Sequence, residues 1–267
     1  MSAPNSVDRI IAMLDVFSED RLEWTPEQLM AKLGYSRPTL YRYLKSLREA
    51  GFLASVPGGG FTLGPRVVEM DFLMRKSDRL VRFGQVHLDA LVASFPCSAL
   101  LVRWYGEKLL CVASEVSVEN PVTSYPRGRP MPLSRGAISR AIMAFLPKRK
   151  LNRIVSGQLD DLRGIGLGPD VSDIFDVLRQ IRRDGVAEAH GEVTPGVIGI
   201  AAPVFEGAAM PIAALSVTIS ASVTTPERIS AIRDRVRSAA NALSAELGER
   251  RERDDTTDTG LRLVNTG

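Results

Sequence analysis

The chain has 267 residues, of which 45% are hydrophobic and 24% charged, a composition typical of a globular protein with two modest domains. No apolar run approaches the roughly 18 residues of a membrane helix, and residues 1–9 do not resemble a signal peptide. We therefore expect a soluble cytoplasmic protein with no membrane partner. The net charge of +3 and the pI of about 9.0 are compatible with nucleic-acid binding but do not establish it.

The few cysteines and histidines exclude a disulfide framework and give no zinc-binding spacing. Cys97 and Cys111 lie in apolar, strand-like runs, so we interpret both as core residues. His87 lies on a predicted helix, where a surface or packing role is favoured over a ligand role. The sequence predicts neither a metal site nor a cofactor.

Two short helices are predicted near the N-terminus. Apolar residues recur at helical spacing over 6–19, and Ser6 is expected to cap this helix. A second helix starts with Thr25 as its cap, has proline in its first turn and ends at Gly34.

A third helix is expected to begin after Ser36 and to reach residue 50. Leu40, Leu44 and Leu47 form its buried side, and stepping about 100° per residue places the basic residues on the opposite side. Two helices joined by a short glycine-containing turn, the later one with a basic outer face, are typical of a helix-turn-helix.

The segment after this helix strengthens the interpretation. Residues 52–56 alternate as a strand, 57–60 form a Pro-Gly turn, and 61–63 return, which predicts a wing. A basic helix face alone is usually solvated surface, and the glycine run lacks the Lys-Ser/Thr pair of a phosphate loop. The order of three helices and a hairpin nevertheless favours DNA binding.

Several side chains are therefore expected at DNA, by reading base edges or gripping phosphates. The wing, around residues 55–61, is expected to reach the neighbouring groove, and binding is expected to weaken with salt. A dimer would bind a near-palindrome with half-sites about one turn apart. The predicted DNA-binding residues are Thr25, Ser36, Arg37, Pro38, Thr39, Tyr41, Arg42, Lys45, Gly58 and Gly59.

The rest of the chain mixes helices and strands, as expected for an α/β sensor domain. One helix is predicted from Pro65 to Lys76 and a second ends before Pro96, so the connection between the domains is helical and would transmit geometry. Residues from Asp254 onward are polar and expected to be disordered. Further predicted strands are 97–105, 109–114, 197–204 and 211–220, and further helices are 134–146, 170–183 and 226–249.

The second domain shows binding features and no catalytic set. No G-x-S-x-G motif occurs, and neither histidine has a partner that suggests a triad. Residues 127–136 bring three arginines to a helix start, a combination that favours a carboxylate ligand. Ser216 and Thr218 share one strand face, where their hydroxyls would bond either a ligand or backbone.

Segments in both halves resemble the IclR family of bacterial transcription regulators: 6–9, 33–44, 47–53, 61–64, 128–133, 184–192 and 199–204. The resemblance spans residues 6–247. It implies an α+β protein with a winged helix-turn-helix (1–64), a linker helix (65–78), a GAF-like α/β effector domain (79–250) and a tail (251–267). It also implies homodimers that often pair into tetramers, and control of genes for catabolism of small organic acids.

The resemblance further implies an effector pocket. Ser134 stands where many family members have histidine, and Val186 where many have an aromatic residue, so the identity of the effector stays open. Whether the protein represses or activates its target genes also stays open. Two alternatives remain: an enzyme with an incidental helix-turn-helix, and a winged helix that binds a protein partner. The implied effector-binding residues are Leu133, Ser134, Gly136, Ala137, Ile138, Glu188 (or Ala189), Val197, Gly199, Ser216 and Thr218.

Overall fold

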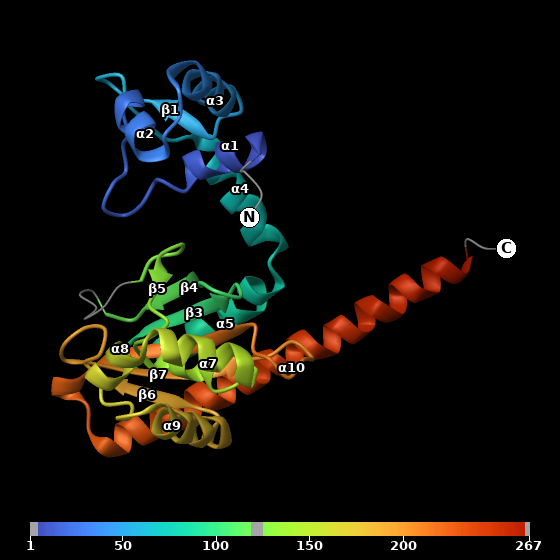
Figure 1. The fold of residues 1–267 in the computed structure, drawn as a ribbon. Helices are drawn as coiled ribbons and strands as arrows, with labels where there is room; N and C mark the ends of the chain where they lie inside the picture. Colours follow the sequence, from blue (N-terminus) through green and yellow to red (C-terminus); the bar gives the residue numbers. More distant parts are fainter. Residues whose placement is uncertain (1–4, 119–124, 265–267) are drawn as a thin grey trace. The chain divides into compact units, whose positions relative to one another are not determined.

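The computed structural model describes residues 5–118 and 125–264, with side chains as far as residue 249 (Figure 1). The chain divides into two compact units between Asp78 and Arg79, and each unit has its own hydrophobic core. None of the described helices is long and apolar enough to cross a membrane.

The first unit opens with helix α1 (Ser6–Leu14), which is capped by a different residue from the one expected. The Asn5 side chain accepts the backbone N–H groups of Val7 and Asp8, so Asn5, and not Ser6, is the cap. The helix ends at Leu14 and not at residue 19, because the backbone then turns and Ser18 pairs with Arg21 in an isolated bridge.

Helices α2 (Pro26–Leu33) and α3 (Arg37–Glu49) form the predicted pair. Thr25 and Gln28 cap α2 reciprocally. Gly34 ends α2 with a φ of 68°, in the left-handed region that favours glycine. Ser36 precedes α3, but its hydroxyl donates to the Thr39 hydroxyl at 3.0 Å and caps no backbone group.

Strands β1 (Leu53–Ser55) and β2 (Phe61–Leu63) form the expected antiparallel wing. Trp24 extends this ladder, because its N–H and carbonyl both bond to the backbone of Phe61, at 3.0 and 2.8 Å. The wing is thereby fixed to the segment before α2. The core of this unit consists of Met13, Trp24, Leu29, Leu40, Tyr43, Leu44, Leu47 and Leu53.

Helix α4 (Pro65–Ser77) ends the first unit and has no buried residue. Exposed fractions reach 72% at Val68, 58% at Phe72 and 57% at Leu73. Large apolar side chains exposed to water around one helix indicate that the helix contacts another chain or domain. The residues of this surface, the α4 apolar surface, are Val67, Val68, Met70, Phe72, Leu73 and Met74.

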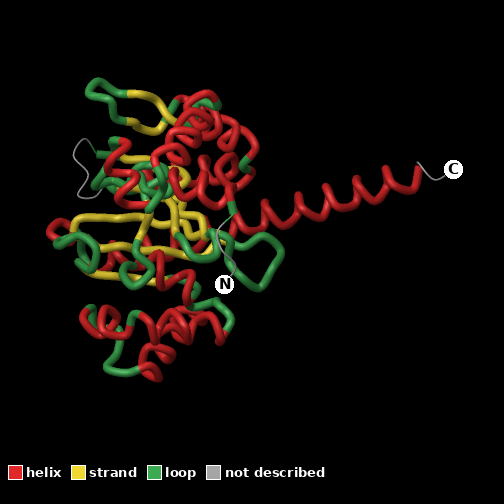
Figure 2. The backbone as a smooth tube through the Cα atoms, turned by 45° about the horizontal axis from the view of Figure 1, so that its top comes forward, coloured by secondary structure: helices red, strands yellow, loops and turns green. Residues whose placement is uncertain are grey.

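The second unit is built on a six-stranded antiparallel sheet (Figure 2). Its strands lie in the order β5-β4-β3-β8-β7-β6, so β3 and β8 are neighbours at the centre although more than a hundred residues separate them. The strands are β3 (Ser98–Trp104), β4 (Leu109–Val116), β5 (Pro130–Met131), β6 (Ala187–His190), β7 (Val197–Val204) and β8 (Ala213–Ser220).

Alternation along the strands divides the buried residues between two faces of this sheet. Leu101 and Val217 pack with α5 (Arg79–Ser94) and α10 (Pro226–Val264) on one face. Leu100 and Val102 pack on the other, with helices α6 (Ala137–Met143), α7 (Lys148–Gly157), α8 (Leu159–Gly164) and α9 (Val171–Asp184). A short 3-10 turn, η1 (Ala221–Val223), precedes α10.

Cys97 and Cys111 belong to these cores, as the sequence predicts. Burial raises the pKa of both thiols to about 11, so neither is ionised near neutral pH. A buried thiol of this kind is a small apolar packing residue.

Three further expectations differ from the structure. Helix α6 begins at Ala137 and not at residue 134, because Gly136 adopts a φ of 87° that a helix cannot contain. Helix α10 continues to Val264, whereas residues from Asp254 were expected to be disordered; no proline interrupts the chain after Pro226. Four elements, α7, α8, β5 and β6, were not predicted as helices or strands.

Candidate functional site

The outward face of α3 carries an excess of positive charge. Arg37, Arg42, Lys45 and Arg48 are exposed, while Leu40 and Leu44 on the opposite side are buried. The only acidic residue of this helix, Glu49, lies 3.8 Å from Lys45, and both side chains are mostly exposed. An exposed pair of this kind contributes little stability, so Lys45 remains available to an anion.

Two arginines of α3 lie against aromatic rings. The Arg37 guanidinium is 5.6 Å from the ring centre of Tyr41, and that of Arg42 is 5.2 Å from Tyr43. Cation–π contacts at this range restrict the guanidinium groups without neutralising them. The helix therefore presents partly ordered positive groups.

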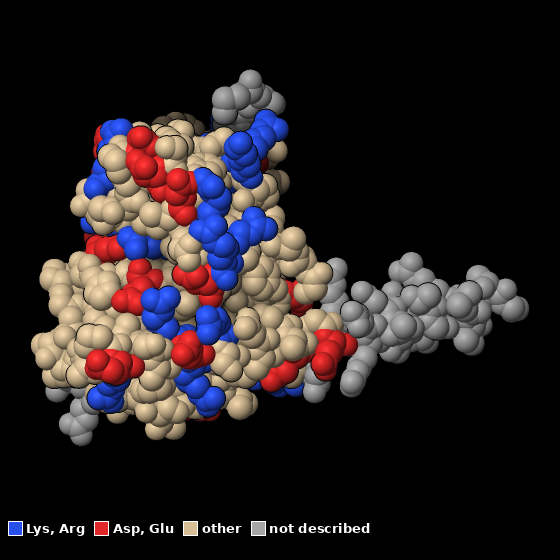
Figure 3. Space-filling view, turned by 90° about the horizontal axis from the view of Figure 1, so that it is seen from below, with Lys and Arg blue, Asp and Glu red and all other residues tan. Residues whose placement is uncertain are grey.

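The wing tip is a tight glycine turn. Gly58 and Gly59 have φ values of 93° and 81°, and a Cβ on either would meet no heavy atom within 4 Å. The tip is thus open on its outer side. On the face of the molecule drawn in Figure 3, Lys and Arg gather in a band at the upper right and elsewhere alternate with Asp and Glu.

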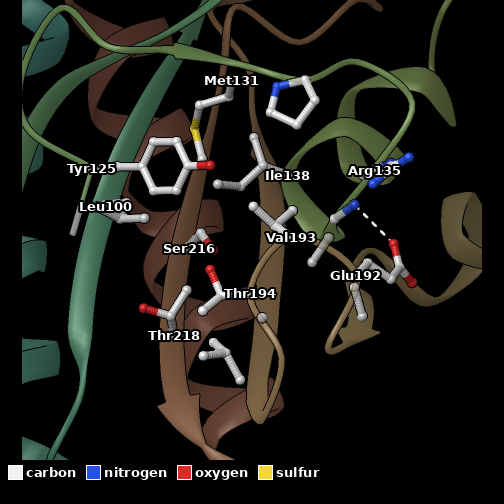
Figure 4. A pocket seen from close by; sticks show the side chains of 16 residues that line it. Leu100, Tyr125, Met131, Arg135, Ile138, Glu192, Val193, Thr194, Ser216 and Thr218 are labelled. Carbon is white, nitrogen blue, oxygen red and sulfur yellow. Dashed lines mark hydrogen bonds between the residues drawn. The ribbon is translucent and has the colours of Figure 1, made fainter. Parts of the chain in front are cut away.

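A pocket lies in the second unit between the sheet and the start of α6 (Figure 4). Its cavity volume is about 50 Å³, and its mouth is partly open to solvent. The described residues that line it are Leu100, Tyr125, Met131, Pro132, Arg135, Gly136, Ala137, Ile138, Ala189, Glu192, Val193, Thr194, Val197, Gly199, Ser216 and Thr218.

The pairing of strands in the sheet determines which residues form the floor of the pocket. Ser216 pairs with Leu100 on one side and Ala201 on the other, and Thr218 pairs with Gly199. The Ser216 hydroxyl donates to the Ile200 carbonyl at 2.8 Å. This bond uses the hydroxyl hydrogen and leaves the oxygen free to accept a hydrogen bond from a ligand.

One end of the pocket is closed by a buried ion pair. Glu192 accepts the backbone N–H of Gly136 at 2.8 Å (the dashed line in Figure 4) and pairs through its other oxygen with Arg140. The side chains of Arg140 and Glu192 are 12% and 7% exposed. Arg140 also donates to the Glu188 carbonyl at 2.8 Å. Burial lowers the pKa of Arg140, and the nearby Glu192 opposes part of that effect.

The three arginines expected to attract a carboxylate have protein partners. Arg127 donates to the Val112 carbonyl, and Arg129 lies 4.8 Å from the ring centre of Tyr125. Arg135 alone lines the pocket, and its guanidinium lies 3.5 Å from the Asp161 carboxylate. Each of these arginines thus has a partner within the protein, but the Arg135 ion pair is half exposed and contributes little stability, so Arg135 remains available to an anion.

Comparison with known families identifies both units. The second unit matches the family model described as "Bacterial transcriptional regulator IclR C-terminal" over residues 76–245, and the first matches "IclR helix-turn-helix domain" over residues 6–57. The chain belongs to the IclR family.

Named relatives agree with this assignment. The chain is similar to the HTH-type transcriptional regulator KipR of Bacillus subtilis, with 24% identity over 91% of this chain and 97% of the relative. It is similar to XynR of Escherichia coli, with 26% identity and the same coverage. This IclR-family chain is therefore a DNA-binding transcription regulator and not an enzyme.

Solved structures share the fold. An IclR regulator from Alicyclobacillus acidocaldarius superposes with a TM-score of 0.78 at 21% identity, covering 92% of this chain and 100% of that one. An IclR homologue from Microbacterium hydrocarbonoxydans, complexed with 4-hydroxybenzoate, superposes with a TM-score of 0.70 at 18% identity, covering 91% and 99%.

Three of the effector-binding residues implied by the IclR resemblance lie outside the pocket lining. Leu133 packs against the core, and the Ser134 hydroxyl faces Asp161 at 3.5 Å. The Glu188 carboxylate contacts His190 at 2.6 Å and Arg233 at 3.3 Å, away from the pocket. The residues that do line it are Gly136, Ala137, Ile138, Val197, Gly199, Ser216 and Thr218, together with the alternative Ala189.

Several lining residues were not singled out from the sequence. Val193 and Thr194 directly follow the family segment 184–192, so extending that segment by two residues would have found them. Leu100 reaches the pocket because β3 pairs with β8, which no local pattern reveals. Glu192 belongs to the recognised segment, but its pairing with α6 is non-local.

Proposed function

We propose that this chain binds specific operator DNA through α3 and the wing, and that a small organic effector in the pocket of the second unit controls this binding. The observation that carries the proposal is the basic outer face of α3 in an IclR helix-turn-helix domain. Such a regulator acts in the cytoplasm, where the DNA lies. Repression and activation both remain compatible with this proposal.

The exposed residues of α3 support distinct roles in the proposal. Arg37 and Arg42 have the geometry to read guanine edges, and Lys45 acts as a point charge on phosphate. Tyr41 is 42% exposed beside Arg37, which suits contact with phosphate or a thymine methyl group. Gly58 and Gly59 would let the wing tip approach the DNA backbone closely.

A homodimer is part of the proposal. The α4 apolar surface supports it, because large apolar side chains exposed along one helix gain stability when a second copy covers them. A two-fold dimer would present two α3 helices to a near-palindromic operator. Pairing of dimers into tetramers stays an expectation from the family resemblance.

The effector of the proposal is a small, largely apolar molecule with a polar group. Leu100, Met131 and Ile138 offer apolar contacts, and the hydroxyls of Ser216 and Thr218 offer polar ones. The Microbacterium homologue is complexed with 4-hydroxybenzoate, a small ring compound with polar groups. The carboxylate expected from the sequence stays part of the proposal, because Arg135 lines the pocket and its exposed ion pair with Asp161 contributes little stability.

The DNA-reading role of α3 is tested by the double variant Arg42→Ala with Lys45→Ala. We expect operator affinity to fall at least about tenfold, and the dependence of log affinity on log salt to flatten by about 1 for each lost phosphate contact. Affinity is measured by fluorescence anisotropy on DNA upstream of the protein's own and neighbouring genes, at two salt concentrations.

The control is Lys148→Ala with Arg149→Ala, which removes the same charge from the exposed start of α7 in the second unit. It should leave operator affinity unchanged. Equal affinities for the α3 variant and the wild type would contradict DNA reading by this helix and favour a winged helix that binds a protein partner.

A further inference from the structure

We infer that Arg135 binds the acid group of the effector and that Asp161 of α8 competes with this group for Arg135. The competition sets how tightly acids bind, while Arg135 gives the pocket its preference for acids over uncharged molecules of the same shape. This inference rests on the proposed effector pocket and names two residues that determine its specificity.

Arg135 supplies positive charge to the pocket. It is the only lysine or arginine among the described lining residues, and its side chain is 47% exposed. Because the pocket mouth is partly open, the guanidinium can change partners without crossing the hydrophobic core. A guanidinium binds a carboxylate through two parallel, charge-assisted hydrogen bonds, which an uncharged amide matches less well.

Asp161 holds this guanidinium loosely. The two groups approach to 3.5 Å, longer than the roughly 2.7–2.9 Å of a charge-assisted hydrogen bond, and the Asp161 side chain is 55% exposed. The other carboxylate oxygen of Asp161 lies 3.5 Å from the Ser134 hydroxyl, again at the limit of hydrogen bonding. An exposed pair contributes little stability, so an acid that enters the pocket can replace Asp161 at small cost.

The second ion pair at this end of the pocket is much less exposed. Glu192 accepts the N–H of Gly136 at 2.8 Å (the dashed line in Figure 4) and also pairs with Arg140. The side chains of Arg140 and Glu192 are 12% and 7% exposed, and removing either would leave a buried, uncompensated charge. Of the two pairs, the one that exchanges with a ligand is therefore Arg135 with Asp161.

Helix α8 keeps Asp161 beside the loop that precedes α6. Leu162, the next residue, is fully buried in the core and fixes the helix. The preceding residue, Asp160, is fully exposed and lies 3.4 Å from Arg163. The helix thus carries two adjacent acids of equal charge, of which Asp161 faces Arg135 and Asp160 faces Arg163, and this pair provides a matched control.

The experiment compares acids with their amides by isothermal titration calorimetry on the full chain. The probes are propionate with propionamide, benzoate with benzamide, and 4-hydroxybenzoate with 4-hydroxybenzamide. For Arg135→Gln we expect acid affinity to fall at least about tenfold and amide affinity to stay within about twofold of the wild type. For Asp161→Asn we expect acid affinity to rise about two- to fivefold, the range expected from the loss of an exposed ion pair.

The double variant Arg135→Gln with Asp161→Asn separates competition from simple charge repulsion. If Asp161 acts through Arg135, removing its charge changes nothing once Arg135 is replaced, so the double variant should bind acids as Arg135→Gln does. Repulsion between Asp161 and the ligand would raise acid affinity in both backgrounds.

The controls make the same charge changes away from the pocket. Asp160→Asn removes a negative charge one residue before Asp161, and Arg153→Gln removes a positive charge from an exposed pair on α7. Both should bind acids and amides as the wild type does. If Arg135→Gln does not fold, Arg135→Lys replaces it: this variant keeps the charge but loses the planar fork, so its acid affinity should still fall.

Three results would overturn the inference: an Arg135 variant that binds acids as the wild type does, Asp161→Asn that binds them no more tightly than Asp160→Asn, or a double variant that binds them more tightly than Arg135→Gln. Absence of acid binding by both the wild type and Asp161→Asn would also overturn it, because a released guanidinium should bind an acid. None of these readouts involves DNA, so failure of the regulator proposal, seen as absent operator binding, is distinguishable.

Discussion

Gly64 lies where the wing passes into α4 and has no room for a side chain. A Cβ built there would lie 2.2 Å from the carbonyl oxygen of Gly51 and 2.9 Å from a backbone carbon of Leu53. Backbone atoms on two sides cannot move aside as a flexible side chain would. The glycine is therefore required by close packing, although its own φ of −93° is ordinary.

We predict that Gly64→Ala destabilises the first unit by about 1–3 kcal/mol or more, as overpacking does. Thermal unfolding of the full chain and operator binding at rising temperature would report the loss. Gly157→Ala is the control: its Cβ would meet nothing within 4 Å at the end of α7, so it should be neutral or stabilise by up to roughly 1 kcal/mol. Similar unfolding of the two variants would contradict the packing argument.

At the scale of residues, sequence predicts which side chains share a face but not what they meet. Alternation along one strand placed Ser216 and Thr218 together, and both line the pocket. The partners of Gly136 could not be read in the same way, because Glu192 reaches it from 56 residues away. The start of α6, where the sequence predicted an anion site, thus binds the carboxylate of Glu192 from the same chain.

At the scale of elements, prediction succeeded where the signal is local. Thr25 and Gly34 mark the ends of α2 by cap chemistry that involves only neighbouring residues. Helix α7 was not predicted because it opens with Lys148, Arg149 and Lys150, where acidic residues usually complement the helix dipole. Tertiary packing of Leu151 and Val155 stabilises it instead.

The cap of α9 gives a prediction with a defined pH dependence. The Asp170 carboxylate accepts the N–H groups of Asp173 and Ser172, at 3.1 and 2.8 Å. These bonds, that from Asp173 first, hold the pKa of Asp170 below its ordinary value. A lowered folded-state pKa means that the cap stabilises the fold above the unfolded pKa of about 3.9 and loses this effect as pH falls below it.

We therefore predict that Asp170→Ala lowers stability at pH 7 and that its difference from the wild type shrinks as pH falls below about 4. Urea unfolding of both proteins between pH 7 and pH 3 measures this difference. Asp176→Ala, on the same helix beyond the cap, should show a smaller effect at pH 7. A difference that stays constant over the acid range would contradict a charge-dependent cap.

At the scale of the whole molecule, local patterns do not reveal how the strands of the second unit assemble. The helical connection over 65–78 was expected, and α4 ends one residue before the two units divide. The strand order of the second unit was not predicted, because β3 and β8 pair across more than a hundred residues. The mixture of helices and strands indicated an α/β domain, and the family resemblance, which carries non-local information, indicated its more detailed fold.

The last prediction concerns the interface of the proposed dimer. Phe72 and Leu73 are 58% and 57% exposed on α4, and burying them against a second copy would contribute to dimer stability. Replacing both by glutamate places like charges in the proposed interface and should raise the dimer dissociation constant at least about tenfold. Sedimentation velocity over a range of protein concentrations measures that constant.

Operator binding should weaken in parallel, because a monomer engages a single half-site. The control is Val223→Glu, which adds a charge at a 72% exposed apolar residue in the second unit and should leave both measurements unchanged. A Phe72→Glu, Leu73→Glu variant that remains dimeric and binds operator as the wild type does would exclude the α4 apolar surface as the interface. Two-fold recognition of the operator would then require a dimer contact elsewhere on the chain.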